Sequence, residues 1–136
     1  MIELTNLTTQ TIPVGGAITF DKVVRHTGCG ECFNSLVPTS VKLRATCGPY
    51  EIEFSANITN ETAGLPVQLA IAAGGAQIPT TARNAVPAAA GDLWGISMGT
   101  YYANCCGDLN RISVINTGPN PVVVAPNSSL RSARRS

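Results

Sequence analysis

The dominant pattern along this 136-residue chain is an alternation of apolar and polar side chains with a period of two. In residues 40–47, SVKLRATC, and in residues 50–58, YEIEFSANI, every second side chain is apolar, so each segment has one apolar and one polar face. The Gly48–Pro49 pair between these segments is typical of a turn. A similar alternation over residues 67–71 leads into Gly74–Gly75, a pair that predicts a hairpin. The pattern therefore predicts half-buried β-strands.

The alanine-rich stretch over residues 70–91 has the composition of a helix but lacks its continuity. Alanine favours helices, yet Gly74–Gly75, Pro79 and Pro87 interrupt every window long enough to hold one. The stretch is interpreted as two strands and a loop. The full set of expected strands covers residues 17–24, 40–47, 50–58, 66–73, 76–80, 93–99, 109–116, 121–125 and 129–134. Short strands with turn signals at this spacing predict an all-β, two-sheet antiparallel jelly-roll sandwich, with residues 1–136 as a single domain.

The low content of charged residues suggests that part of the protein surface is covered by a partner. Charged residues make up 12% of the chain and hydrophobic residues 44%, whereas soluble domains average about 25% charged residues. Such a surface predicts burial against a partner, such as another copy of the chain. The net charge of +1 gives no general attraction to nucleic acid or to an anionic membrane, so neither is expected as a partner. No apolar run approaches the roughly 18 residues that span a bilayer, and residues 1–10 do not have the pattern of a signal peptide.

Five segments, taken in order, resemble a known family. They are GGAITFDKVV (15–24), GPYEIEFSANI (48–58), VQLAIAAGGAQIP (67–79), GDLNRISVINTG (107–118) and NSSLRSARR (127–135). Their order is similar to that of successive strands in the C1q/TNF-like jelly-roll family. The chain resembles most the small stand-alone members found in Gram-positive bacteria and their phages. The resemblance extends over nearly the whole chain, and it is carried by the order of the motifs rather than by any single motif.

The resemblance implies a non-enzymatic homotrimer on a phage particle or a bacterial surface. Such a module would serve as a fibre, tip or decoration that attaches to a receptor, a glycan or a neighbouring virion protein, and it would be found on the virion or outside the cell. In trimers of this family, one sheet of each protomer packs around the three-fold axis. The aromatic candidates for that contact are Tyr50, Phe54, Tyr101 and Tyr102, with ordinary core positions as the alternative. No collagen-like or coiled-coil stalk is present in the sequence.

The five cysteines are not a general feature of the family, and they leave several interpretations open. Residues 33–40 lack a helical period, which argues against a redox-active C-x-x-C at Cys29 and Cys32. A zinc site formed by Cys29, Cys32, Cys105 and Cys106, or including His26, gives the alternative function of a small zinc-binding structural protein. Disulfides, for instance from Cys32 to Cys105 or Cys106, and free neutral thiols are the other options. Cys47 is expected to be a small buried hydrophobe, and the odd count leaves at least one thiol free or paired between chains.

No catalytic residue is predicted. His26 is the single histidine, no G-x-S-x-G motif is present, and a cupin-like metal enzyme needs two or three histidines. Glu51 and Glu53 are expected to pair with Lys42 and Arg44 across adjacent strands.

Apart from zinc, no cofactor is expected except calcium, which some members of the family hold with loop acids. The candidates here are Asp92 and Asp108. The sequons at Asn6, Asn57, Asn60 and Asn127 are interpreted as chance matches in a chain rich in Ser, Thr and Asn.

Overall fold

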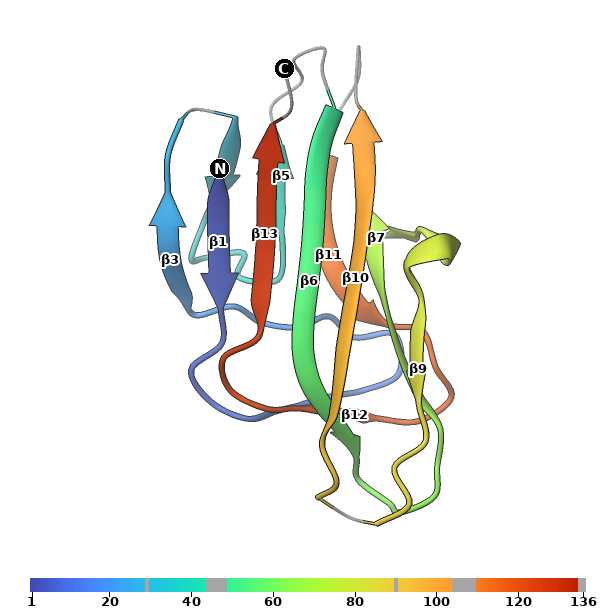
Figure 1. The fold of residues 1–136 in the computed structure, drawn as a ribbon. Helices are drawn as coiled ribbons and strands as arrows, with labels where there is room; N and C mark the ends of the chain where they lie inside the picture. Colours follow the sequence, from blue (N-terminus) through green and yellow to red (C-terminus); the bar gives the residue numbers. More distant parts are fainter. Residues whose placement is uncertain (29, 44–48, 90, 104–109, 135–136) are drawn as a thin grey trace.

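Two antiparallel β-sheets pack face to face in the computed structural model of the chain (Figure 1). The structure describes residues 1–136 except for residues 29, 44–48, 90, 104–109 and 135–136. The all-β, two-sheet jelly-roll sandwich expected from the alternation of side chains is confirmed. No helix in the described part of the chain is long and apolar enough to cross a membrane.

The front sheet, which faces the viewer in Figure 1, is organised around one long strand. Its strands are β1 (Ile2–Thr5), β2 (Gln10–Ile12), β3 (Lys22–His26), β6 (Pro49–Asn60), β10 (Trp94–Ala103), β12 (Val122–Val124) and β13 (Ser129–Arg134). The order is β2-β12-β6-β13-β1-β3, and β10 pairs with the other edge of β6. Strand β10 pairs with β6 along its whole length, from Trp94 opposite Ile58 to Ala103 opposite Pro49. It therefore forms one border of the front sheet.

The rear sheet closes the sandwich behind β6. It contains β4 (Glu31–Phe33), β5 (Val41–Leu43), β7 (Val67–Ala73), β8 (Ala76–Gln77), β9 (Arg83–Ala85) and β11 (Asn110–Asn116), with the 3-10 turn η1 (Pro79–Thr81) between β8 and β9. The order is β4-β5-β11-β7-β8, and β9 also pairs with β7. The predicted hairpin at Gly74–Gly75 is confirmed, because Ala73 faces Ala76 and both glycines have positive φ, 60° and 84°.

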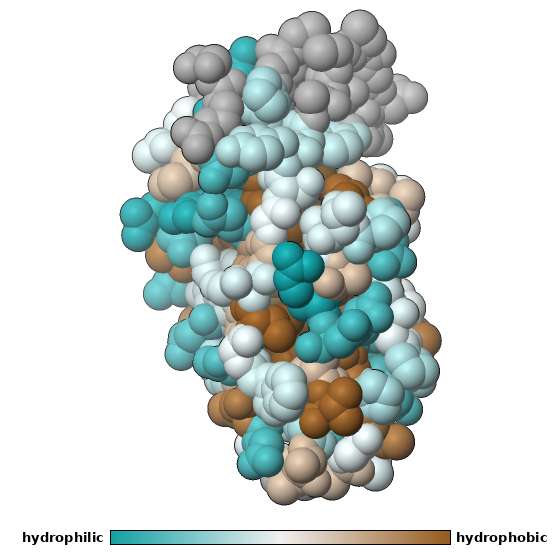
Figure 2. Space-filling model, turned by 45° about the vertical axis from the view of Figure 1, so that its right-hand side comes forward, coloured by the Kyte–Doolittle hydropathy of each residue, from teal (hydrophilic) through white to brown (hydrophobic). Residues whose placement is uncertain are grey.

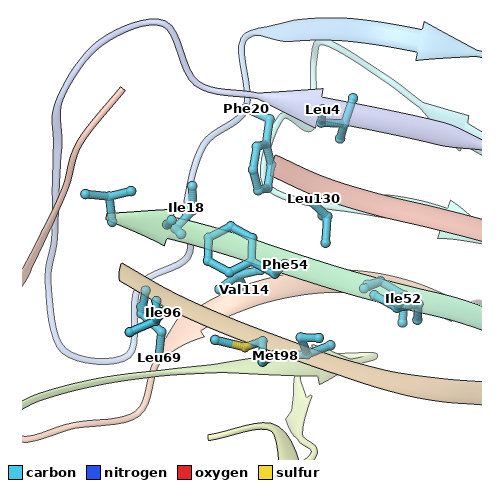
Figure 3. Close-up of a cluster of buried hydrophobic side chains, with 14 of the residues drawn as sticks. Leu4, Ile18, Phe20, Ile52, Phe54, Leu69, Ile96, Met98, Val114 and Leu130 are labelled. Atoms are coloured by element: carbon cyan, nitrogen blue, oxygen red, sulfur yellow. The ribbon is translucent and has the colours of Figure 1, made fainter. Parts of the chain in front are cut away.

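The core lies between the sheets and is made by the apolar faces of the strands. In β6 the buried side chains alternate with partly exposed or exposed ones as far as Ile58, which is the pattern expected of a half-buried strand. Figure 3 shows Phe54 and Ile52 from β6 beside Leu4 and Leu130, together with Val114 and Leu69 from the rear sheet. The largest fully buried side chains include Tyr50, Phe20 and Phe54. Burial of this apolar area is the main favourable contribution to folding.

The expected pairing of the segment over residues 40–47 with the segment over residues 50–58 is wrong. Strand β5 pairs with β4 and β11 in the rear sheet, whereas β6 pairs with β10, β12 and β13 in the front sheet. Lys42 of β5 therefore lies in a different sheet from Glu51 and Glu53, and Arg44 lies outside the described residues. A period of two identifies the buried face of a strand but does not identify the strand beside it.

Candidate interaction surface

The outer face of the front sheet carries a row of alternating charges across four strands. Glu53 of β6 faces Arg131 of β13, Arg131 faces Glu3 of β1, and Glu3 faces Arg25 of β3. Arg131 forms an ion pair with Glu53, and the Nε atom of Arg25 lies 3.0 Å from Oε1 of Glu3. Opposite charges on directly facing residues stabilise a sheet by a few tenths of a kcal/mol to about 1 kcal/mol. Glu53 thus pairs with a cation on β13, a strand of its own sheet.

A row of serines runs beside the charged row. Ser97 of β10 and Ser129 of β13 both face Ser55 of β6, one on each side. Gly95, Ser97 and Gly99 alternate outward on β10, so no large side chain stands above this part of the sheet. The result is a depression of about 480 Å³, here called the central depression. Its lining consists of Glu53, Phe54, Ser55, Arg83, Ser97, Met98, Gly99, Ser129 and Arg131.

Arg83 closes one side of the central depression and links the two sheets. It belongs to β9 of the rear sheet, yet its Nε atom donates to the backbone oxygen of Ser97 on β10 at 3.1 Å. Its Nη1 atom donates to the backbone oxygens of Thr80 at 3.3 Å and Ala82 at 2.9 Å. Figure 2 shows strongly hydrophilic groups in the middle of the visible face, between nearly neutral and hydrophobic ones. Three hydrogen bonds to backbone oxygens hold this guanidinium in one place.

The four aromatic residues predicted to contact other subunits occupy different environments. Tyr50 is 0% exposed and Phe54 is 1% exposed, because both lie on the core face of β6. The Tyr50 hydroxyl donates to the backbone oxygen of Gly30 at 3.1 Å. The expected interface position is therefore corrected for Tyr50 and Phe54, whose rings are already covered within one protomer. Tyr101 is 65% exposed on the outer face of β10, and Tyr102 is partly buried against the core, so these two residues stay as predictions.

Most of the predicted cysteine site lies outside the described residues. Cys32 is exposed on β4, whereas Cys29, Cys47, Cys105 and Cys106 are not described. Within the described ranges, no three His, Cys, Asp or Glu side chains are grouped so as to hold a metal ion. His26 is exposed on the border strand β3, opposite Ile2. The zinc, disulfide and free-thiol interpretations therefore stay as predictions.

The calcium prediction also stays untested. Asp92 is exposed just before β10 begins. Asp108 lies outside the described residues, between the end of β10 and the start of β11.

A buried carboxylate lies close to the amino terminus. Glu31 on β4 is 1% exposed, and its Oε2 atom lies 3.1 Å from the α-ammonium group of Met1. Met1 also donates to the backbone oxygen of Thr27 at 2.6 Å and accepts from the Thr27 amide. Apart from this ion pair, neither carboxylate oxygen of Glu31 has a hydrogen-bond partner in the described part of the chain. A single ammonium group therefore compensates a buried negative charge.

The lower end of the sandwich in Figure 1 carries exposed apolar residues. Two loops meet there, because the amide of Gly64 donates to the backbone oxygen of Pro87 at 2.8 Å. The exposed apolar residues of this end are Leu65, Val86, Leu93 and Trp94. The sequence does not reveal this group, because its members are brought together only by the fold.

The chain has the fold of jelly-roll proteins. No family model matches it, and no curated protein is similar enough to name a relative. Among solved structures it is similar to the PRD1 vertex protein P5, with a TM-score of 0.53 and 19% sequence identity over 99% of this chain and 96% of that chain. At this identity the likeness shows the fold alone. The resemblance to the C1q/TNF-like family stays a prediction.

Proposed function

We propose that the chain is a non-enzymatic structural and binding module of a phage particle that works as a C1q/TNF-like homotrimer. It would form a fibre, a tip or a decoration of the virion and attach to a receptor, a glycan or a neighbouring virion protein. The observation that supports this proposal is the full-length similarity in fold to a phage vertex protein, which covers 99% of this chain. Trimerisation would then strengthen weak individual contacts through avidity.

Exposed aromatic area on the front sheet supports the trimer. Tyr101 lies on the outer face of β10, and the residue is 65% exposed in the isolated protomer. Aromatic residues are enriched where protein surfaces meet, because they bury a large area at a small cost in side-chain entropy. Since Tyr50 and Phe54 lie in the core, Tyr101 and its neighbour Tyr102 are the remaining aromatic candidates for contact between subunits.

Light scattering after size exclusion tests the trimer. We expect three times the mass of the 14.1 kDa chain at micromolar concentration. The variant Tyr101→Glu should shift the protein toward monomer, because it places a charge in an apolar contact. Thr11→Glu is the control, since Thr11 is exposed on β2 and separated from β10 by β12 and β6. A wild-type monomer under these conditions would contradict the proposal.

A further inference from the structure

We propose that the central depression binds the carboxylate group of an acidic saccharide, with Arg83 as the residue that recognises it. The inference rests on the proposed attachment role, and it names the chemical class of the ligand. The central depression holds about 480 Å³ and lies on the outer face of the front sheet. A volume of this size matches the lower range of small-molecule sites.

The guanidinium of Arg83 is held in a fixed position and, within the described part of the chain, still has free N–H donors that could bind an anion. Its Nε and Nη1 atoms are bound to backbone oxygens, which fixes the plane of the guanidinium. Its Nη2 atom has no partner among the residues that the structure describes. A planar, fixed guanidinium is well suited to bind a carboxylate.

The charges around the central depression favour an anion. The lining contains two arginines, Arg83 and Arg131, and one carboxylate, Glu53. Glu53 is ion-paired with Arg131, so one positive charge of the lining remains, and it belongs to Arg83. A negatively charged group that enters the depression would be attracted to this uncompensated charge.

The floor of the central depression favours a sugar as the carrier of the carboxylate. The hydroxyl groups of Ser55 and Ser97 have no hydrogen-bond partner in the described part of the chain, and they can both donate and accept. Gly99, which faces Glu53 at the end of the charged row, has no side chain and allows a ring to approach the backbone closely. Phe54 and Met98 direct their side chains into the core, which leaves the floor of the depression polar. A ring that carries several hydroxyl groups complements such a floor.

An acidic peptide fits this place less well. An extended peptide would bind a border strand through its backbone groups. At the middle of β10 the backbone oxygen of Ser97 already accepts a hydrogen bond from Arg83. An added strand would have to displace Arg83, which is the residue that attracts the acid.

Binding is measured by calorimetry or saturation-transfer NMR on the full chain at low ionic strength. The probes are glucuronate and N-acetylneuraminate, with glucose, acetate and a short polyglutamate peptide as comparisons. We expect the acidic sugars to bind at least about tenfold more tightly than glucose or acetate, since a hydrogen-bonded ion pair and the serine hydroxyls act together. Equal binding of glucose and glucuronate, tighter binding of the peptide, or no binding of either acidic sugar would overturn the inference.

Gly99→Val fills the central depression without touching Arg83. A Cβ atom at position 99 would lie 3.4 Å from the Ile52 backbone oxygen and 3.7 Å from Cγ of Glu53, both ordinary contacts, so the variant should fold. Gly95→Val is the matched control on the same face of β10, because position 95 does not line the depression. Binding should be lost in Gly99→Val and kept in Gly95→Val, and equal binding by the two variants overturns the inference.

Arg83→Gln tests the recognition of charge. It should weaken binding of the acidic sugars about tenfold or more. Arg111→Gln is its control, since Arg111 lies on β11 of the rear sheet and donates to the hydroxyl of Ser40, just before β5. Light scattering on the same samples separates this test from the proposed trimer. A trimer that binds no acidic sugar overturns this inference alone, whereas a monomer that binds one overturns the trimer alone.

Discussion

Buried asparagine side chains hold the loops of this sandwich together. Asn6 donates to the backbone oxygens of Thr8 and Ala125, and its Oδ1 atom accepts from the amide and the hydroxyl of Ser128. Asn60 likewise donates to the backbone oxygens of two loop residues. Both positions are parts of sequons that were interpreted as chance matches. Because the side chains are buried and bonded to loop backbone, their structural role accounts for these asparagines.

Glu31 gives a residue-scale prediction about charge compensation. Acetylation of the Met1 amino group should lower the free energy of unfolding by about 3 kcal/mol, because a buried carboxylate would lose the ammonium 3.1 Å away. Glu31→Leu should lower the free energy of unfolding much less, because it removes the buried negative charge that needs a counter-ion. Urea unfolding of the acetylated, unmodified and variant chains measures the difference. A larger loss for Glu31→Leu than for acetylation would contradict this account.

The elements that the sequence predicted best are those in which alternation continues for several residues. Strands β6 and β7 were predicted close to their observed bounds, because apolar side chains alternate along them and glycine-containing turns follow or precede them. Strands β1, β2, β4 and β9 were missed, since each has only three or four residues and owes its shape to the neighbouring strand. Local pattern identified every strand of six or more residues, whereas several of the shortest strands depend on tertiary pairing.

Gly118 gives an element-scale prediction about the crossing from β11 to β12. A Cβ atom at this position would lie 2.9 Å from the backbone nitrogen of Gln68 on β7. Gly118→Ala should therefore lower the free energy of unfolding by about 1–3 kcal/mol, since the backbone of either segment must shift. Gly95→Ala is the matched control, because its Cβ atom would meet the Asn57 side chain at 3.5 Å. Thermal unfolding compares the two variants, and equal effects would contradict the explanation.

At the scale of the whole molecule, the candidate surface depends on contacts between distant parts of the chain. Glu53 and Arg131 are 78 positions apart, and Arg83 reaches Ser97 from the opposite sheet. The spacing of residues along the sequence does not show which distant residues will meet. The sandwich could therefore be predicted from the sequence, but the central depression could not. Two of the four aromatic candidates, Tyr50 and Phe54, lie in the core for a related reason. Alternation places Tyr50 and Phe54 on the apolar face of β6, which is the face that the rear sheet covers.

The cysteines give a prediction for the whole molecule. If the four predicted ligands hold zinc, protein purified without added metal should contain about one equivalent of zinc by elemental analysis, and thiol titration should rise after chelation. Disulfides would instead give fewer than five titratable thiols in the denatured, unreduced protein, with no zinc. Five titratable thiols together with less than about a tenth of an equivalent of zinc would exclude both the zinc site and the disulfides. All five cysteines would then be free thiols.

The hydrogen bond from Arg83 to Ser97 has a consequence for crowded assemblies. Border strands with unpaired backbone groups can join one molecule to the next and grow into insoluble ribbons. The guanidinium occupies one of these groups halfway along β10, and its charge repels the same side chain of an approaching copy. Copies of this chain at high local concentration are thus less prone to join through the free edge of β10.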